Sequence, residues 1–431
     1  MIRNKAEFSI KDKGSFVASA LQWANAFSHL SYFQSNDIPY PFEGFTEVLM
    51  CGAHKVLNRH TGNTFAYVGD FHHKIGDYLA GYFGYDLKNE VEALSSLHND
   101  PLDCPLYSFF QPLHIIFLYE ERVEIHSPLD PYVVFAQIQA TPCPVPDTHE
   151  SISLIPHMSR MEYLERFEKI RQHIEEGDVY ELNLCMGFTG NAAISPVFRY
   201  LLLNELSPAP FSCFQKNHHH YLLSASPERF LRKKGDQVLS QPIKGTAPRG
   251  GNPNEDEQLK VALRHNEKEL AENMMIADLV RNDLARTAIP GTVKAEELFG
   301  IYSFRQVHQM ITSISAKVSS ETHWADIIKH AFPMGSMTGA PKVMAMQLIE
   351  KYETLRRGIY SGAAGFITPS GDFDMNVVIR SLIYNEKTQT LGFQVGSAIT
   401  YDAEGTAEYQ ECLLKASAIC KLLGSDLTPF T

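Results

Sequence analysis

The order of the predicted strands and helices constrains the fold more than any other feature of this sequence. The first third of the chain is a run of short strand-like segments, and the part after Gly177 is mostly strands with a few long helices. Parallel sheets require strands that alternate with crossover helices, whereas strands that follow one another pair through short turns. The sequence therefore predicts an α+β fold with antiparallel sheets.

Several strand-like segments are well defined by their apolar patterns and turn residues. Tyr221–Leu231 and Gln237–Ile243 flank a Lys-Lys-Gly-Asp turn and are predicted to form a hairpin. The segment Leu113–Tyr119 is predicted to be a buried strand, since its apolar run is too short to cross a membrane. The other predicted strands are Val307–Val318 and the three members of a meander, Ile359–Ile367, Phe373–Tyr384 and Leu391–Tyr401.

The helices are marked by capping residues and by apolar residues at helical spacing. Ser159 and Glu162 form a capping box for a helix that ends at Gly177. Glu257–Arg286 is predicted to be one long helix, and a final helix runs from about Thr406 to Leu423 and stops at Gly424. The glycine-rich loop 335–339 is predicted to lead into a helix with Pro341 in its first turn.

The proline-rich connector 141–147 is the best candidate for a boundary within the chain. We therefore expect an N-terminal region, residues 1–145, and a catalytic region, residues 155–425, intertwined in one globular unit. Gly84-Tyr85-Asp86 is the most distinctive motif of the N-terminal region.

Composition excludes several classes of protein. The formal net charge of −12 argues against binding to nucleic acid or to an acidic membrane surface. No apolar run is long enough to span a bilayer, and the N-terminus lacks the apolar stretch of a signal peptide. Seven cysteines at scattered spacings, with no CxxC pair, indicate free thiols in a reducing compartment and no structural zinc. We expect a cytoplasmic protein.

Two predicted helices each carry two glutamates three residues apart, which places both carboxylates on one helix face. The pairs are Glu269 with Glu272 and Glu408 with Glu411. Either pair alone is typical of a solvated surface. Two such pairs in mainly apolar helices favour a hard divalent cation, and ligands that are oxygen atoms only suit Mg²⁺ better than zinc.

The predicted hairpin brings an acid and an amine close together. Pairing about its turn places Glu228 opposite Gln241 or Pro242, with Lys244 about one diagonal step away. A carboxylic acid beside a lysine in a partly dry site can serve as a general acid and a nucleophile. The alternative is an exposed ion pair at a sheet edge, which contributes little.

A third group of residues is suited to binding an anion. The glycine-rich loop is expected to present backbone N–H groups at a helix start. Simple registers of the meander place Tyr360, Arg380 and Gly396 on neighbouring strands, with Arg380 on a polar face beside Asp374 and Asn376. Arginine, tyrosine and bare glycine N–H groups together form a good carboxylate receptor. A slip of one residue in the register would separate them.

His308 follows the apolar alternation of its strand, so we expect it to be at least partly buried. Either a core histidine with its hydrogen bonds satisfied or an acid–base group is consistent with this position.

At these residues the sequence resembles the chorismate-utilising enzymes of the anthranilate synthase component I superfamily, and within it the aminodeoxychorismate synthase branch. The resemblance is strong over about residues 159–418. The matching stretches are GDVYELNL (177–184), SASPERF (224–230), PIKGTAPRG (242–250), NEKELAENMMIADLVRNDLAR (266–286), GSMTGAPK (335–342), IYSGAAGF (359–366) and AEYQE (407–411). The resemblance implies large antiparallel sheets packed as a sandwich with helices on the outside.

The resemblance also implies roles for the residues singled out above. Glu272 and Glu411 would hold Mg²⁺, with Glu269 and Glu408 as close or water-bridged partners. The metal would bind the ring carboxylate of chorismate, and Glu228 would be the general acid for the C4 hydroxyl. The remaining substrate-binding residues would be Ser336, Thr338, Tyr360, Arg380, Gly396, Ala398 and Lys415, with His308 lining the same site.

Lys244 distinguishes between branches of the superfamily. Anthranilate, isochorismate and salicylate synthases typically carry alanine here, which leaves C2 of the ring open to ammonia or water. By resemblance, a desolvated Lys244 would attack C2 itself and direct ammonia to C4, which gives 4-amino-4-deoxychorismate. The stretch from Glu181 to Leu184 also resembles this branch.

The chain contains no Gly-x-Cys-x-Gly nucleophile motif, so the resemblance implies ammonia from a separate glutamine amidotransferase. A separate aminodeoxychorismate lyase is expected to release 4-aminobenzoate for folate synthesis. Two alternatives stay open: an anthranilate or isochorismate synthase of the same superfamily, and a non-catalytic subunit that binds chorismate or tryptophan.

Overall fold

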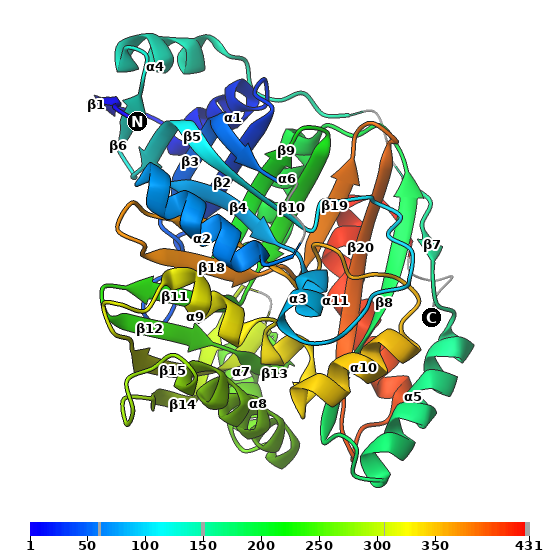
Figure 1. Ribbon diagram of the computed structural model, residues 1–431. Helices are drawn as coiled ribbons and strands as arrows, with labels where there is room; N and C mark the ends of the chain where they lie inside the picture. The colour runs from blue at the N-terminus through cyan, green and yellow to red at the C-terminus, as the bar shows by residue number, and fades with distance from the viewer. Residues whose placement is uncertain (59–61, 148–150, 306, 427–431) are drawn as a thin grey trace.

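The computed structural model describes residues 1–58, 62–147, 151–305 and 307–426. The predicted α+β class is confirmed, since helices cover a large sheet whose named strands all pair antiparallel (Figure 1). No helix in the described ranges is both long and apolar enough to cross a membrane.

The sheet divides into two arms at one long strand, β5 (Tyr107–Leu118). One edge of β5 pairs with β3 (Val48–Leu57), and the other edge pairs first with β4 (Leu79–Phe83) and then with β6 (Arg122–Ser127). Strand β1 (Asn4–Ser9) adds to β6. After β3, the first arm continues through β2 (His29–Gln34), β9 (Phe211–Asn217), β10 (His220–Ser226), β19 (Ser381–Asn385), β20 (Thr390–Ile399) and β8 (Glu181–Asn191), with β7 (Ile155–Pro156) and β16 (Gly339–Ala340) on β8. After β4, the second arm continues through β17 (Ala363–Ile367), β18 (Phe373–Val377), β11 (Arg229–Lys234), β12 (Gln237–Gln241) and β15 (Val307–Lys317), with β13 (Ile243–Pro248) and β14 (Lys294–Ser303) on β15.

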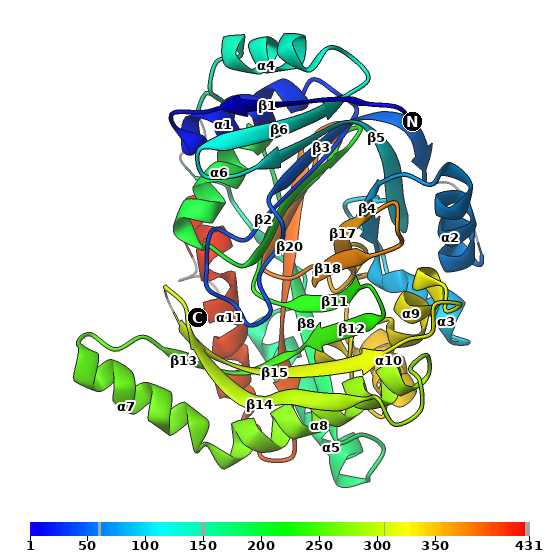
Figure 2. The ribbon, with the colours of Figure 1, turned by 90° about the vertical axis from the view of Figure 1, so that its left-hand side faces the viewer.

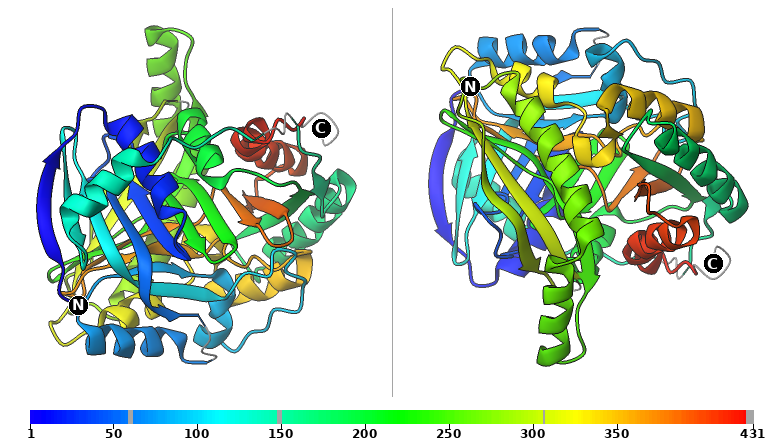
Figure 3. Two further views of the ribbon diagram at one scale, coloured as in Figure 1. Left: turned by 90° about the horizontal axis from the view of Figure 1, so that it is seen from above. Right: turned by 90° about the horizontal axis from the view of Figure 1, so that it is seen from below.

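The two arms pack against each other as a sandwich, as the resemblance implied (Figure 2). The apolar cluster between them includes Phe33, Phe211 and Leu222 of the first arm and Tyr82 and Phe366 of the second. Further apolar clusters lie under the outer helices. The first arm is covered by α1 (Lys13–Ala24), α5 (Arg160–Glu175), α6 (Pro196–Leu206), α10 (Lys342–Tyr352) and α11 (Gly405–Leu422), and the second by α2 (Thr64–Ile75), α8 (Glu267–Ala285) and α9 (Trp324–Ala331). The remaining helices are α3 (Lys88–Val91), α4 (Pro131–Ala140), α7 (Pro253–Arg264) and the 3₁₀ turns η1 (Tyr85–Leu87) and η2 (Gly335–Met337). Helix α7 projects from the body of the molecule (Figure 3).

The predicted hairpin is confirmed next to its turn, where β11 pairs antiparallel with β12. Two of the predicted strands are nevertheless too long, because each one breaks where the chain passes from one arm to the other. Tyr221–Leu231 is divided at Pro227 and Glu228 into β10 and β11. Phe373–Tyr384 is divided into β18 and β19 by residues 378–380, where Arg380 has a φ of 52°. The predicted meander is therefore not one sheet of consecutive neighbours. The two crossings lie side by side, since the Val377 amide donates to the Glu228 carbonyl over 3.0 Å.

The single helix predicted over Glu257–Arg286 is also wrong, because α7 and α8 are separate helices. Asn266 begins α8 as its N-cap, and its side chain accepts a hydrogen bond from the Glu269 amide at 3.2 Å. An asparagine cap gives the chain a new helix start and lets it change direction.

The glycine-rich loop leads into α10, as predicted, but Ala340 and Pro341 separate it from the first residue of that helix. It forms η2 and the short strand β16, and Pro341 is the N-cap of α10 rather than part of its first turn. The Met337 and Thr338 amides donate within the loop to the carbonyls of Met334 and Gly335. These two N–H groups are therefore not directed at an anion.

The other helix predictions are confirmed. Ser159 and Glu162 form the capping box of α5, and Gly177 follows that helix with a φ of 84°. The final helix, α11, ends at Leu422 just before Gly424. Strands of the N-terminal region pair directly with strands of the catalytic region, β2 with β9 and β4 with β17.

Candidate active site

The glutamate pair of α8 faces the glutamate pair of α11. Lys268 of α8 connects the helices, with its Nζ 3.1 Å from Glu408 Oε1 and 3.8 Å from Glu272 Oε1. Glu272 and Glu408 are almost fully buried, whereas Glu411 is partly exposed. The sequence alone could not show that the two pairs converge.

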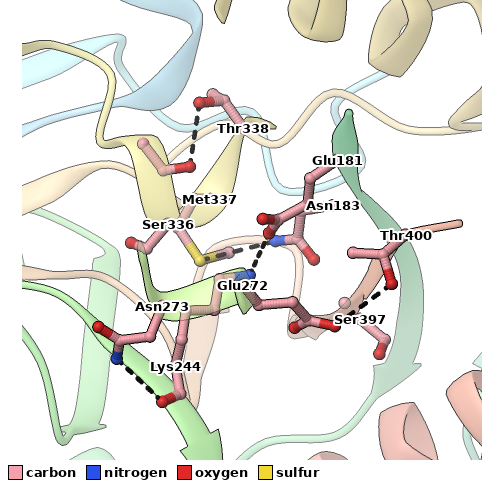
Figure 4. Close-up of polar contacts among 12 residues, drawn as sticks. Glu181, Asn183, Lys244, Glu272, Asn273, Ser336, Met337, Thr338, Ser397 and Thr400 are labelled. Carbon is pink, nitrogen blue, oxygen red and sulfur yellow. Dashed lines mark hydrogen bonds and ion pairs between the residues drawn. The ribbon is translucent and has the colours of Figure 1, made fainter. Parts of the chain in front are cut away.

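Strand β20 and the residue that follows it supply hydroxyl groups to the carboxylates. Ser397 Oγ donates to Glu408 Oε2 and also to Glu411 Oε2, the latter over 3.2 Å. Thr400 Oγ1 donates to Glu272 Oε1 over 3.3 Å (Figure 4). Lys415 Nζ lies 2.7 Å from Glu411 Oε1.

The carboxylates differ in their affinity for protons. Burial raises the pKa of Glu272 to about 7. Burial also acts to raise the pKa of Glu411, but Lys415 outweighs it and lowers that pKa. The four groups offer oxygen donors only, and Lys268 shows that a cation is held between the helices. This donor set fits a hard divalent cation. Among the described residues, however, only His173, Glu176 and Asp178 bring three donor atoms within 4.8 Å of one another.

Glu228 is a buried carboxyl at the crossing between the arms. Its Oε1 accepts a hydrogen bond from Ser336 Oγ at 2.6 Å, which joins it to the glycine-rich loop. Burial raises the pKa of Glu228 to about 7, although Ser336 and the charge of Lys244 act in the opposite direction. A carboxyl with such a pKa is protonated in part at neutral pH and can donate that proton.

Lys244 extends from β13 past Glu272 of α8 toward Glu181 (Figure 4). Its Nζ lies 2.5 Å from Oε1 of Glu181, a buried residue of β8. Burial acts to lower the pKa of Lys244, but Glu181 and Glu272 outweigh it and raise the pKa. The lysine is therefore an ammonium in this arrangement and must lose a proton before it can act as a nucleophile.

Arg380 is a half-buried cation that forms no ion pair with any described residue. It lines a cavity of about 60 Å³ together with Pro227, Phe304 and Gln309. Burial lowers its pKa, and the nearby Tyr360 and Glu411 act in the opposite direction. An unpaired guanidinium beside a cavity is suited to a carboxylate ligand.

Gly396 and Ala398 of β20 pair with Cys185 and Asn183 of β8. The amides of Cys185 and Asn183 donate elsewhere, to Glu353 and to the Thr338 carbonyl, so these are the pairs without ladder hydrogen bonds. The N–H groups of Gly396 and Ala398 therefore point away from β8. On that side Lys415 Nζ donates to the Gly396 carbonyl over 2.9 Å.

Two of the predicted site residues are turned away from this cluster. His308 is fully buried, but its ring nitrogens face Ser303 Oγ at 2.8 Å and Asp256 Oδ1 at 3.0 Å. The Thr338 hydroxyl donates within its own loop, to the carbonyls of Met334 and Gly335. Of the loop hydroxyls, Ser336 is the one bonded to Glu228.

Sequence reasoning missed the polar residues that join these groups. Lys268 is four residues before Glu272 on one helix face, which is a local signal for an ion pair. The pairing of Glu181 with Lys244, and of Ser397 and Thr400 with the glutamates, depends on strand positions that no local pattern predicts.

Solved structures with this architecture identify the fold first. Anthranilate synthase component I from Streptococcus pneumoniae superposes with a TM-score of 0.74 at 23% identity, over 96% of this chain and 92% of that chain. The menaquinone-specific isochorismate synthase MenF of Escherichia coli gives a TM-score of 0.77 at 16% identity, over 98% and 94%. The fold is therefore that of the anthranilate and isochorismate synthases.

Sequence comparison then identifies the family. A family model described as chorismate binding enzyme matches residues 22–421, and the chain belongs to this family. Relatives named aminodeoxychorismate synthase component 1 come from Klebsiella aerogenes, 35% identical over 80% of this chain and 77% of the relative, and from Escherichia coli, 34% identical over 80% and 76%. These matches confirm the resemblance stated from the sequence.

Proposed function

We propose that this protein aminates chorismate at C4 in a Mg²⁺-dependent reaction that gives 4-amino-4-deoxychorismate. The observation that carries the proposal is Lys244, whose ammonium lies in the same cluster as the glutamates of α8 and α11 and interacts with the charge of Glu228. The relatives of similar length are named for this synthase, which agrees with the proposal.

The proposed chemistry assigns one task to each group. Lys244, after passing a proton to its hydrogen-bond partner Glu181, attacks C2 of the ring through its amine, while both ring double bonds shift and the C4–O bond breaks. Glu228 gives its proton to the departing hydroxyl, which leaves as water. Ammonia then attacks C4, and the lysine amine leaves from C2. The net change replaces the C4 hydroxyl by an amino group.

The substrate's carboxylates would be bound at two places. Arg380, Tyr360, Lys415 and the N–H groups of Gly396 and Ala398 would hold the enolpyruvyl carboxylate. Glu272 and Glu411, with Glu269 and Glu408, would hold Mg²⁺, which when bound supplies positive charge to the ring carboxylate. Ser336 would orient the proton of Glu228.

Ammonia would come from a separate glutamine amidotransferase, because the names of the relatives designate them as one component of a larger enzyme. A separate lyase would convert the product to 4-aminobenzoate for folate synthesis. We place the protein in the cytoplasm, since its seven cysteines are all free thiols.

The test is to incubate the pure protein with chorismate, Mg²⁺ and an ammonium salt, and to identify the product by chromatography and mass spectrometry. A product that added lyase converts to 4-aminobenzoate is the expected result. Anthranilate or isochorismate would contradict the proposal in favour of another synthase of the superfamily. An absence of turnover, even with a glutaminase partner present, would favour a non-catalytic binding subunit.

Lys244→Ala tests the residue that carries the proposal. Loss of the C4-aminated product, by about 100-fold or more, is expected because the variant has no amine to attack C2. Unchanged formation of that product would eliminate the proposed role of Lys244.

A further inference from the structure

A buried arginine lies beneath the loop that carries Ser336. Arg357 is only 2% exposed, and all its N–H groups face acceptors. It forms a two-bond pair with Glu353, from Nε to Oε2 at 3.0 Å and from Nη2 to Oε1 at 2.6 Å. Glu353 directly follows α10 and is itself buried.

The rest of the guanidinium joins two separate pieces of backbone. Nη1 donates to the Met337 carbonyl of η2 over 2.6 Å, and Nη2 donates to the Asn183 carbonyl of β8 over 2.9 Å. Glu353 Oε1 reinforces the second contact, because it accepts from the Cys185 amide at 2.9 Å. The pair therefore fixes η2 relative to β8.

Each of these pieces holds one of the two proposed reacting groups. Strand β8 carries Glu181, the partner of Lys244, and η2 carries Ser336, the partner of Glu228. The distance between the amine and the acid thus depends on how η2 and β8 are placed.

The N-terminal region braces the same arginine from its other side. The Tyr85 amide donates to the Gly358 carbonyl over 2.7 Å, and the Gly358 amide donates to Asp86 Oδ2 over 3.0 Å. The Arg357 guanidinium lies 4.5 Å from the centre of the Tyr85 ring, within range of a cation–π interaction. The buried Tyr85 hydroxyl has no hydrogen-bond partner among the described residues, so the ring provides this contact.

We propose that Arg357, held by Glu353 and braced by Tyr85 and Asp86, is a positioning residue that sets the geometry between Lys244 and Glu228. The inference rests on the proposed function in that both groups act on one substrate. It also assigns a purpose to the Gly84-Tyr85-Asp86 motif, which lies far from the reacting groups in sequence. A misplacement of about 1 Å between reacting groups can cost about 100-fold in rate.

The first test compares Arg357→Lys with a matched control, Arg3→Lys. Arg3 also pairs through two bonds with a carboxylate, Asp77, and also donates to two carbonyls, those of Leu113 and Pro112. A lysine has its donors on one atom and cannot span η2, β8 and Glu353 together. We expect Arg357→Lys to lower kcat by about 10- to 100-fold while KM for chorismate changes by less than about threefold. We expect Arg3→Lys to lose stability with kcat unchanged.

A second comparison uses Tyr85→Leu and Tyr85→Phe. Phenylalanine keeps the ring under the guanidinium, whereas leucine removes it, so kcat should fall only in the leucine variant. This pair decides the question if Arg357→Lys does not fold. Hydrogen–deuterium exchange should increase at residues 335–339 and 181–185 in Arg357→Lys and Tyr85→Leu, but not in Arg3→Lys.

Three results would overturn the inference: a loss of kcat no larger than in Arg3→Lys, a rise in KM with kcat intact, or unaltered exchange in both segments. Activity is measured as chorismate consumption. Because this assay does not depend on which product forms, the kcat values of the variants can be compared whatever the product is. A product other than 4-amino-4-deoxychorismate would contradict the proposed function alone. The exchange measurement does not depend on activity at all.

Discussion

At the scale of single residues, we expect Glu228 to set the pH dependence of the proposed activity. Its pKa of about 7 follows from burial, and the proposed general acid must carry a proton. Because the proposed transfer of the Lys244 proton to Glu181 stays within the site, it adds no pH dependence of its own, and we expect kcat/KM for chorismate to fall as pH rises above about 7, approaching tenfold for each pH unit. Glu228→Gln should lower kcat by about 100-fold or more and remove this decline, as measured by initial rates between pH 5.5 and 9.

Ser336→Ala is the control for that profile. The Ser336 hydroxyl donates to Glu228 and lowers its pKa, so its removal should move the decline to higher pH while activity is retained in part. A decline that stays in place in Ser336→Ala, or that persists in Glu228→Gln, would assign it to another group.

The same pKa predicts a pH-dependent stability. The folded-state pKa of Glu228 lies above the ordinary carboxyl value of 4.5. The stabilisation that Glu228 contributes is therefore fully present below pH 4.5 and is lost as pH rises through 7. The cost of the buried carboxylate above pH 7 is at most about 3 kcal/mol. Urea unfolding should therefore show Glu228→Gln gaining stability relative to the wild type between pH 5 and pH 8. An equal difference at both pH values would contradict this.

At the scale of elements, the contact between β16 and β8 depends on a glycine. Gly339 has a φ of +148°, and a Cβ there would lie 2.1 Å from the Glu181 carbonyl oxygen and 3.0 Å from Ala345 Cβ. We expect Gly339→Ala to cost about 2–3 kcal/mol of stability by forcing β16 from β8, as measured by urea unfolding. Gly291→Ala is the control, since Gly291 has a φ of +79° with open space around its Cβ position and should cost about 1 kcal/mol. Equal losses in the two variants would show that backbone strain, rather than the collision, is responsible.

The elements also show what the sequence could and could not predict. Local patterns identified α5 through Ser159 and Glu162, and α11 through its apolar spacing. They failed at Glu228 and Arg380, because a strand that changes from one arm to the other keeps the same alternation of side chains. The glutamates could be paired along each helix, but their meeting across α8 and α11 is a tertiary contact. The partners of Lys244 and Arg357 lie 63 and 174 residues away at Glu181 and Asn183, beyond any local signal.

Because the carboxylates of α8 and α11 face each other, we expect Mg²⁺ to stabilise the folded protein. A cation bound by their carboxylates in the folded state alone raises stability by about 2.7 kcal/mol at 100 times its dissociation constant. Calorimetry should show a Tm that rises and saturates with Mg²⁺ and falls again with a chelator. Glu272→Gln should abolish the rise.

Glu176→Gln is the matched control, because Glu176 belongs to the other carboxylate group, with His173 and Asp178 at the end of α5. The rise in Tm should survive this change. A rise that is lost in Glu176→Gln and kept in Glu272→Gln would place the cation at α5 instead.

At the scale of the whole molecule, the two regions proposed from the sequence share one sheet. Strand β2 is hydrogen-bonded to β9, and β4 to β17, so neither region completes its sheet alone. The proline-rich connector therefore joins two regions that share one sheet. We expect a single cooperative unfolding transition for residues 1–145 and 155–425.

The two tryptophans of the chain allow a direct measurement of this cooperativity. Trp23 lies on α1 of the N-terminal region, and Trp324 lies on α9 of the catalytic region, where its Nε1 donates to His72 Nδ1 of α2 over 3.1 Å. Trp324→Phe leaves Trp23 as the fluorescent probe, and Trp23→Phe leaves Trp324. In each variant the urea midpoint from tryptophan fluorescence should coincide with the midpoint from far-UV circular dichroism, because unpairing β2 from β9 exposes a strand edge in both regions at once. A fluorescence midpoint clearly below the circular dichroism midpoint in either variant would show that the region around that tryptophan unfolds by itself.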